Sequence, residues 1–135
     1  MHPGRPSTTA EHAALLRAVH QLQDRPLTLE DPVVLRLIDA STIATLRTHP
    51  EAFQTRLRAS IAVRSRYAED CLRDAVDRGT RQYVILGAGL DSFAYRNPFP
   101  PSVLHVFEVD HPQTQARPRQ VFAKYAGIAT STCLH

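Results

Sequence analysis

The sequence has few of the features that mark secreted, membrane-spanning or disulfide-bonded proteins. Its two cysteines, Cys71 and Cys133, lie far apart and form no CxxC pair, which disfavours a disulfide framework or a zinc ribbon. No apolar run approaches the roughly 20 residues that a membrane helix needs. The first residues lack the apolar segment of a secretory signal. We therefore expect a soluble cytoplasmic protein with no membrane partner.

Strong charge of one sign is also lacking. The 135 residues include 16 Lys and Arg against 13 Asp and Glu, a formal net charge of +3, and Lys124 is the single lysine. Nucleic-acid-binding proteins concentrate basic residues on one face or stripe. Here the arginines are spaced among acidic residues, so we expect no nucleic-acid partner. The 43% share of hydrophobic residues suits one soluble domain.

Two common patterns of enzyme sites are missing. The seven histidines lack the spacing of metal ligands, and His111 beside Asp110 is interpreted as a loop residue, so we expect no metal. Ser92 lacks the GxSxG context of a hydrolase nucleophile. Zinc chemistry and serine hydrolysis are therefore not the functions that the sequence favours.

Helical patterns fill the first part of the chain. Thr8 opens a capping box with S/T-x-x-E spacing, which predicts a helix over residues 9–22. Asp31-Pro32 combines an N-cap with proline at the first helical position, and predicts a short helix through Ile38.

A long helix is the clearest local prediction. His49-Pro50 opens it and Gly79 closes it. Its apolar stripe, with residues three or four apart, consists of Phe53, Leu57, Ile61, Ala68, Leu72 and Ala75, and is widened by Cys71 and Val76.

Two short apolar runs then predict neighbouring strands. Tyr83–Leu86 is bounded by a glycine and is typical of a parallel strand that is buried on both faces. Residues 103–109 form the second run, and a helix is expected to start at Asp110-His111-Pro112, with Pro118 kinking or stopping it. The order predicts an α/β fold with an incomplete parallel sheet preceded by helices.

The patterns divide the chain into three parts. Residues 1–80 form an N-terminal helical cover, residues 81–129 form the first βαβ unit of a ligand-binding domain, and residues 130–135 form a tail that fits neither.

A glycine turn and a distant acid predict a nucleoside site. Gly87-Ala88-Gly89 follows the first strand, where glycines let the backbone turn sharply and approach a ligand. Asp110 lies 21 residues after Gly89, at the end of the second strand. An acid at this position can accept hydrogen bonds from both hydroxyls of a ribose. Asp110 could instead serve as a helix N-cap, and one side chain could do both.

A dinucleotide is the alternative ligand. Its glycine fingerprint needs Gly or Ala at the third position, where this chain has Ser92. Asp91 would also place a negative charge beside phosphates. A cationic sulfonium ligand with an α-amino group tolerates Asp91 better, so the charge argues against NAD and an NAD-dependent oxidoreductase.

Arg64 falls on the predicted apolar stripe of the long helix. A guanidinium facing the core needs an anionic partner. Asp91 or Glu108 could supply one, and so could a ligand carboxylate. The side chain could instead extend its charged end to solvent, so a structural role and a ligand contact both stay open. For Arg96 surface exposure is expected, and for Tyr67 and Tyr95 core packing.

These features together resemble the leucine carboxyl methyltransferase-like family of class I methyltransferases. The resemblance covers roughly residues 10 to 129. Its motifs are His20-Gln21-Leu22, Asp31-Pro32, Arg64–Asp70, Tyr83–Arg96 with the sequence YVILGAGLDSFAYR, Phe107–Pro112 with the sequence FEVDHP, and Thr114-Gln115.

The resemblance implies a Rossmann-like fold, S-adenosyl-L-methionine as methyl donor, and O-methyl transfer to a small-molecule acceptor or a carboxylate. It also implies that Gly87 and Gly89, with Ala88 between them, line the methionine portion of the cofactor. By the same analogy Asp110 holds the ribose and Arg64 meets the cofactor carboxylate. No protein nucleophile is required, because the reaction is a direct displacement at the sulfonium methyl group.

The chain departs from the family's pattern at two places. Ala116–Arg119 stands where members usually carry an aromatic residue and a lysine, and the family continues for about as many residues again. We therefore expect a truncated or frameshifted fragment whose catalysis on its own is doubtful. The alternative function is a non-catalytic module that binds an adenosine-type ligand, or a partner at the unfinished sheet edge.

Overall fold

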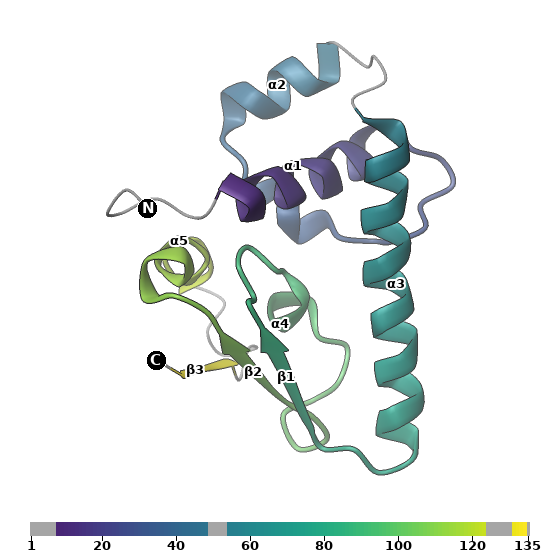
Figure 1. Ribbon diagram of the computed structural model, residues 1–135, viewed down its shortest axis with the longest axis vertical. Coiled ribbons are helices and arrows are strands. Elements are labelled where there is room, and N and C mark those ends of the chain that lie inside the picture. Colours follow the sequence, from purple (N-terminus) through teal and green to yellow (C-terminus); the bar gives the residue numbers. More distant parts are fainter. Residues whose placement is uncertain (1–7, 49–53, 124–130, 135) are drawn as a thin grey trace.

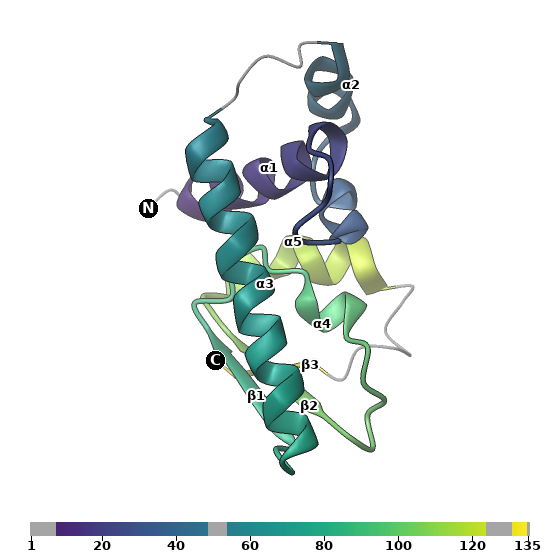
Figure 2. The same cartoon turned by 90° about the vertical axis from the view of Figure 1, so that its right-hand side faces the viewer.

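A computed structural model of the protein describes residues 8–48, 54–123 and 131–134. The helices are α1 (Thr8–Gln23), the 3-10 helix η1 (Pro32–Arg36), α2 (Ala40–Thr48), α3 (Thr55–Asp77), α4 (Phe93–Arg96) and α5 (Pro112–Phe122). The strands are β1 (Gln82–Leu86), β2 (His105–Val109) and β3 (Ser131–Leu134). In both Figure 1 and Figure 2, α1 lies against the first half of α3, beyond the carboxyl ends of β1 and β2.

The three strands form one parallel sheet in the order β1-β2-β3. Tyr83 of β1 is paired with Val106 of β2, and Val106 is paired in turn with Ser131 of β3. The predicted α/β fold is confirmed. The third strand corrects the expectation of two strands followed by a tail at 130–135, because Ser131–Leu134 continue the sheet; residues 130 and 135 lie outside the described residues.

Burial alternates along β1. Tyr83 and Ile85 pack against apolar side chains of α3 and α4. On the other face Val84 is 51% exposed and Leu86 is 77% exposed. The prediction that this strand is buried on both faces is therefore wrong within the described residues, because their helices cover one face of β1.

Two apolar clusters hold the elements together. One joins α1, η1, the turn after β1 and α5 through Ala14, Ala18, Val34, Leu37, Leu90 and Phe122. The other joins α3 and α4 to the sheet through Leu72, Val76, Phe93, Ala94, Leu104 and Val106. Tyr95 contacts both clusters, as its predicted core packing requires, and its ring stacks 4.3 Å from that of Phe122.

The buried stripe of α3 differs from the predicted one. The buried residues of this helix are Arg58, Ala62, Leu72 and Val76, whereas Ala68 and Cys71 are exposed and Leu57 is 44% exposed. Leu72 and Val76 belong to both stripes. The error arose because polar side chains with ion-pair partners occupy inward positions, which an apolar pattern cannot find. Phe53 and His49-Pro50 lie outside the described residues.

The other helices follow their local signals closely. The predicted helix 9–22 corresponds to α1, and Asp31 caps η1 by accepting a hydrogen bond of 3.1 Å from the Val34 amide. α2 was not predicted, although Asp39 accepts from the Thr42 amide at 2.8 Å in the manner of an N-cap. α5 continues past Pro118 to Phe122, so Pro118 does not stop it.

Asp24 links the end of α1 to α3. Its carboxylate accepts two hydrogen bonds of 2.8 Å from the buried Arg58 guanidinium, and His20 Nδ1 lies 2.7 Å away. The Arg58 hydrogen bonds, which outweigh the opposing effect of burial and are helped by His20, hold the pKa of Asp24 below its usual value of 3.8. The pair should therefore stabilise the fold only while Asp24 is ionised.

This arrangement predicts a pH dependence of stability. Because the folded pKa is lowered, the contribution of Asp24 is fully present above about pH 4 and is lost as the pH falls through the folded pKa. We expect Asp24→Asn to reduce the free energy of unfolding at pH 7 by about 1.5–3 kcal/mol, the range for hydrogen bonds to charged groups. Urea titrations at pH 7 and pH 3 would show a smaller loss between the two pH values in the variant. An equal loss in both proteins would contradict the role of this pair.

Candidate functional site

A cavity of about 690 Å³ lies where the carboxyl ends of the strands face α1 and α3. This volume is within the usual range for small-molecule sites. It is lined by Thr9, Ala10, Ala13 and Arg17 of α1, Ile61, Arg64, Ser65, Ala68 and Glu69 of α3, Tyr83 of β1, Gly87–Asp91, Phe93, Asp110 and Thr114. Ligands of open parallel sheets bind at this end of the strands.

The glycine turn approaches α1 closely. Gly87 and Gly89 have φ angles of +63° and +58°, a left-handed conformation that favours glycine. A Cβ atom built on Gly89 would lie 3.1 Å from Cβ of Ala10, whereas one on Gly87 would meet nothing within 4 Å. The glycine at position 89 is therefore needed both for its backbone conformation and for the close contact with α1.

Asp110 joins the turn to the end of β2. Its Oδ2 accepts a hydrogen bond of 2.6 Å from the Gly89 amide, and its Oδ1 accepts one from the amide of His111. A carboxylate has about four acceptor sites, so these two bonds leave capacity for a further donor. Asp110 is only partly buried and lines the cavity. The N-cap position of α5 belongs to His111 instead, whose side chain accepts from the Gln113 amide.

Asp91 presents a carboxylate oxygen to the cavity. Its Oδ1 accepts from the Phe93 amide at 2.7 Å, and its Oδ2 lies 3.7 Å from an Arg17 nitrogen. That separation is too long for a hydrogen bond. Among the residues that the structure describes, no hydrogen bond reaches Oδ2. With a side chain 31% exposed, Asp91 is placed to receive a positive group from the cavity.

Arg64 is exposed and is not part of the buried stripe of α3. It lines the cavity, yet it pairs with neither Asp91 nor Glu108. Within the described ranges its guanidinium has no hydrogen bond or ion pair. Glu108 is 1% exposed and does not line the cavity. The interpretation of Arg64 as one half of an internal bridge is therefore wrong.

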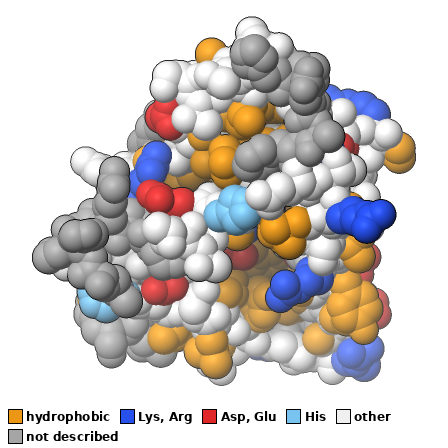
Figure 3. All heavy atoms as spheres, turned by 45° about the horizontal axis from the view of Figure 1, so that its top comes forward, with side chains coloured by type: hydrophobic (Ala, Val, Ile, Leu, Met, Phe, Trp, Pro, Cys, Tyr) orange, Lys and Arg blue, Asp and Glu red, His pale blue; other side chains and the backbone are white. Residues whose placement is uncertain are grey.

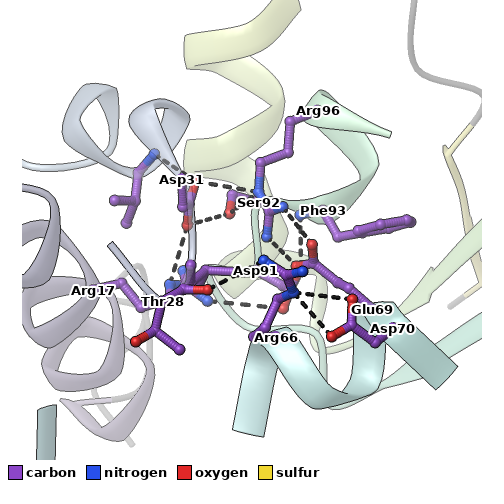
Figure 4. Close-up of polar contacts among 12 residues, drawn as sticks. Arg17, Thr28, Asp31, Arg66, Glu69, Asp70, Asp91, Ser92, Phe93 and Arg96 are labelled. Atoms are coloured by element: carbon purple, nitrogen blue, oxygen red, sulfur yellow. Dashed lines mark hydrogen bonds and ion pairs between the residues drawn. The ribbon is translucent and has the colours of Figure 1, made fainter. Parts of the chain in front are cut away.

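Arg17 and Arg96 are the arginines of a polar cluster that adjoins the cavity (Figure 4). Arg17 lies 3.5 Å from Asp31, and Arg96 lies 3.3 Å from the other oxygen of Asp31. Arg96 also donates to both oxygens of Glu69. Surface exposure was expected for Arg96, but its side chain is only 15% exposed. Burial acts to lower the pKa of Arg96, but the bonds to Glu69 and the charge of Asp31 outweigh it and raise this pKa.

Two tyrosines differ in their relation to the cavity. Tyr83 lines it, and burial, followed by the negative charges of Asp91 and Glu69, raises the pKa of its hydroxyl. Tyr67 is 71% exposed, so the expectation of core packing for it is wrong. Burial and the acidic side chains of the cavity wall therefore favour the neutral form of Tyr83.

The structure brings all six sequence-predicted binding residues to this one cavity, namely Arg64, Gly87, Ala88, Gly89, Asp91 and Asp110. Sequence reasoning missed the contribution of α1. The available signal was Arg17, which stands between the buried residues Leu16 and Ala18. A guanidinium on a buried helix face indicates an internal anion, and the residue in that position is Arg17 of α1 rather than Arg64 of α3.

Metal-binding clusters and membrane-spanning helices are both absent from the part of the chain that the structure describes. On the face in Figure 3, basic, acidic and apolar side chains are intermixed. In residues 8–48, 54–123 and 131–134 no group of three or more His, Cys, Asp or Glu could hold a metal ion. No helix in these ranges is long and apolar enough to cross a membrane.

Comparison with known proteins places this site in context. The sequence profile described as "Leucine carboxyl methyltransferase" matches residues 10–132. A Bacillus subtilis protein named "Putative S-adenosyl-L-methionine-dependent methyltransferase YktD" is 33% identical over 85% of this chain and 46% of its own length. Relatives with the same general name from Mycobacterium marinum and Mycolicibacterium smegmatis are 38% and 32% identical, over 77% and 91% of this chain and 37% and 44% of their own lengths. The chain thus spans less than half the length of these relatives.

Proposed function

Because this chain belongs to the leucine carboxyl methyltransferase family, we propose that its cavity binds S-adenosyl-L-methionine and serves methyl transfer to an oxygen of a small molecule or carboxylate. The observation that carries the proposal is the position of Asp110. Its carboxylate lies beside a glycine turn, at the carboxyl ends of two adjacent parallel strands. A nucleoside bound across these strand ends would have its ribose beside the carboxylate and its 5′ substituent beside the backbone of the glycine turn.

The ribose assignment is supported by the remaining hydrogen-bonding capacity of Asp110. Its two oxygens each accept one backbone bond, from Gly89 and His111. These bonds orient the carboxylate before any ligand arrives, which reduces the entropy cost of binding. Two ribose hydroxyls are donors that match an ionised carboxylate.

The charges around the cavity match a zwitterionic amino-acid tail. Arg64 on the α3 wall is a cation with no described partner, and Asp91, two residues after Gly89, has an oxygen without a described hydrogen bond. We assign the ligand carboxylate to Arg64 and the ligand ammonium to Asp91. Phosphate groups would instead meet the negative charge of Asp91, which disfavours a dinucleotide.

When bound, S-adenosylmethionine would supply an electrophilic methyl group for direct displacement by an acceptor oxygen. The role of this chain's residues in that reaction is to bind and orient the donor and to exclude water. The acceptor is proposed only as a small molecule or a carboxylate.

Calorimetric titration tests the ligand class. We expect the 135-residue chain to bind S-adenosylhomocysteine, the demethylated product, and to give no heat with NAD. Heat with NAD alone would contradict the proposal. No heat with either would favour the remaining candidate, a partner-binding module, which the exposed apolar side chains Val84 and Leu86 of β1 would support.

Replacement of Arg64 separates a ligand contact from a structural role. We expect Arg64→Leu to weaken S-adenosylhomocysteine binding about 10-fold or more, the value of a charge-assisted hydrogen bond. Its melting temperature should stay unchanged or rise, because the exposed guanidinium has no described partner to lose. The control is Arg56→Leu, an exposed arginine of α3 that does not line the cavity. Equal affinities in the two variants would overturn the assignment of Arg64.

A further inference from the structure

Asp31 lies beneath the cavity and does not line it. Its side chain has no exposed surface. One oxygen accepts from the Val34 amide at 3.1 Å, and the other accepts from the Ser92 hydroxyl at 2.6 Å. A carboxylate buried this completely requires positive partners. Arg17 of α1 and Arg96 of α4 supply them.

Asp31 and the carbonyl of Leu90 hold the Arg17 guanidinium at a distance from Asp91. Its Nε lies 3.5 Å from Asp31, and one terminal nitrogen donates to the carbonyl of Leu90. The other terminal nitrogen forms a long ion pair of 3.7 Å with Asp91 Oδ2, without a hydrogen bond. Figure 4 shows Arg17 between the two carboxylates. Asp31 and Leu90 thus restrain a cation that would otherwise form a close pair with Asp91.

The charges of this cluster do not cancel. It contains two cations, Arg17 and Arg96, and three anions, Asp31, Glu69 and Asp91. Glu69 is hydrogen-bonded to Arg96 through both oxygens, and Asp31 is enclosed. Asp91 is the most exposed of the three carboxylates and has an oxygen without a described hydrogen bond. The excess negative charge is therefore presented to the cavity at Asp91.

We propose that Asp31 is a positioning residue that keeps Arg17 from forming a close, hydrogen-bonded pair with Asp91, so that Asp91 remains available to the ammonium group of the cofactor's amino-acid tail. The inference rests on the proposed function and deepens it, because it assigns the selectivity for an amino-acid tail to a residue that does not touch the ligand. The charge at position 31, rather than the size of the side chain, carries this effect.

Removal of that charge has a defined consequence. In Asp31→Asn the amide can still cap η1, as Asn does at other helix starts. Arg17 loses its anionic partner at position 31 and closes the 3.7 Å gap to Asp91. The cluster becomes neutral, and a ligand ammonium loses its partner. A ligand without an ammonium group is unaffected, because Asp110 and the glycine turn are unchanged.

The test compares two ligands that share the nucleoside. S-adenosylhomocysteine carries the amino-acid tail, whereas 5′-methylthioadenosine ends at the thioether. We expect Asp31→Asn to weaken the first about 10-fold or more and the second by no more than about twofold. The matched control is Asp24→Asn, which removes the carboxylate partner of Arg58 away from the cavity. That control should leave the ratio of the two affinities unchanged.

A second variant keeps the test decisive if Asp31→Asn unfolds. Arg17→Met removes the cation that Asp31 restrains, so the ratio of affinities should stay the same or shift toward S-adenosylhomocysteine. In the double variant Asp31→Asn, Arg17→Met the ratio should return to within about threefold of wild type, because no guanidinium is left to approach Asp91.

Three outcomes would overturn the inference. The first is an equal loss of both ligands in Asp31→Asn, which indicates a structural role alone. The second is a selective loss of S-adenosylhomocysteine in Arg17→Met, which would make Arg17 itself the contact of the tail. The third is that the wild-type chain binds neither nucleoside, in which case the proposed function fails and this inference with it.

Discussion

Asp110→Ala should reduce the affinity for S-adenosylhomocysteine about 100-fold or more. Two hydrogen bonds from ribose hydroxyls to an ionised carboxylate contribute about 1.5–3 kcal/mol each, and each 1.4 kcal/mol is roughly a factor of ten. The substitution also removes the acceptor of the Gly89 amide, which fixes the turn at 2.6 Å from the carboxylate. Both effects act in the same direction.

Isothermal titration of the variant and two controls measures this effect. Asp74→Ala removes an exposed carboxylate of α3 that does not line the cavity, and should leave the affinity unchanged. Asp110→Asn retains a carbonyl acceptor without the charge, and should fall between alanine and wild type. Melting curves show whether the loss comes from unfolding. A folded Asp110→Ala variant with wild-type affinity would refute the ribose assignment.

The second large effect is expected from Gly89→Ala. At a φ of +58° a Cβ atom costs about 1–2 kcal/mol, and this one would also lie 3.1 Å from Cβ of Ala10. Either α1 or the turn must shift to relieve the contact. We expect the free energy of unfolding to fall by about 2–3 kcal/mol. We also expect ligand binding to fall below the detection limit, because the turn lines the cavity.

Gly87→Ala is the matched control for backbone strain. Its φ of +63° is nearly the same, yet its Cβ would meet nothing within 4 Å. Urea unfolding of the two variants therefore isolates the contact with α1. Gly79→Ala adds a left-handed position that does not line the cavity. If Gly87→Ala and Gly89→Ala reduce the free energy of unfolding equally, the close approach of α1 to the turn adds nothing to the cost of the Gly89 substitution.

The fold was predictable where local signals and burial agree. The helix over 9–22, the capped helix after Asp31 and the two strands around the glycine turn all carry such signals. The inward face of α3 was not predictable from apolar spacing. Arg58 is buried there and Glu69 is partly buried, because Asp24 and Arg96 pair with them from positions 34 and 27 residues distant in sequence. A pattern restricted to one helix contains no information about such pairs.

The candidate site was predictable from its turn and its acid, because both follow strands that end at the same edge. Arg17, which lines the cavity, and its buried partner Asp31 were not predicted. The ion pair between these two residues depends on the position of α1. That position is set by the apolar cluster that contains Ala14, Leu37 and Leu90. For Arg64 the premise of a core-facing guanidinium was wrong, because the residue is exposed and lines the cavity.

Because Ala10 of α1 lies close to Gly89, the docking of α1 is coupled to the binding of any ligand in the cavity. A molecule that touches both the turn and Thr9, Ala10 or Ala13 binds only to chains in which α1 is docked, and by linkage it must tighten that docking by the same free energy. Amide protons of α1 should then exchange with solvent more slowly as the occupant's concentration rises. The first helix, remote in sequence from the glycines, thereby reports on the state of the whole site.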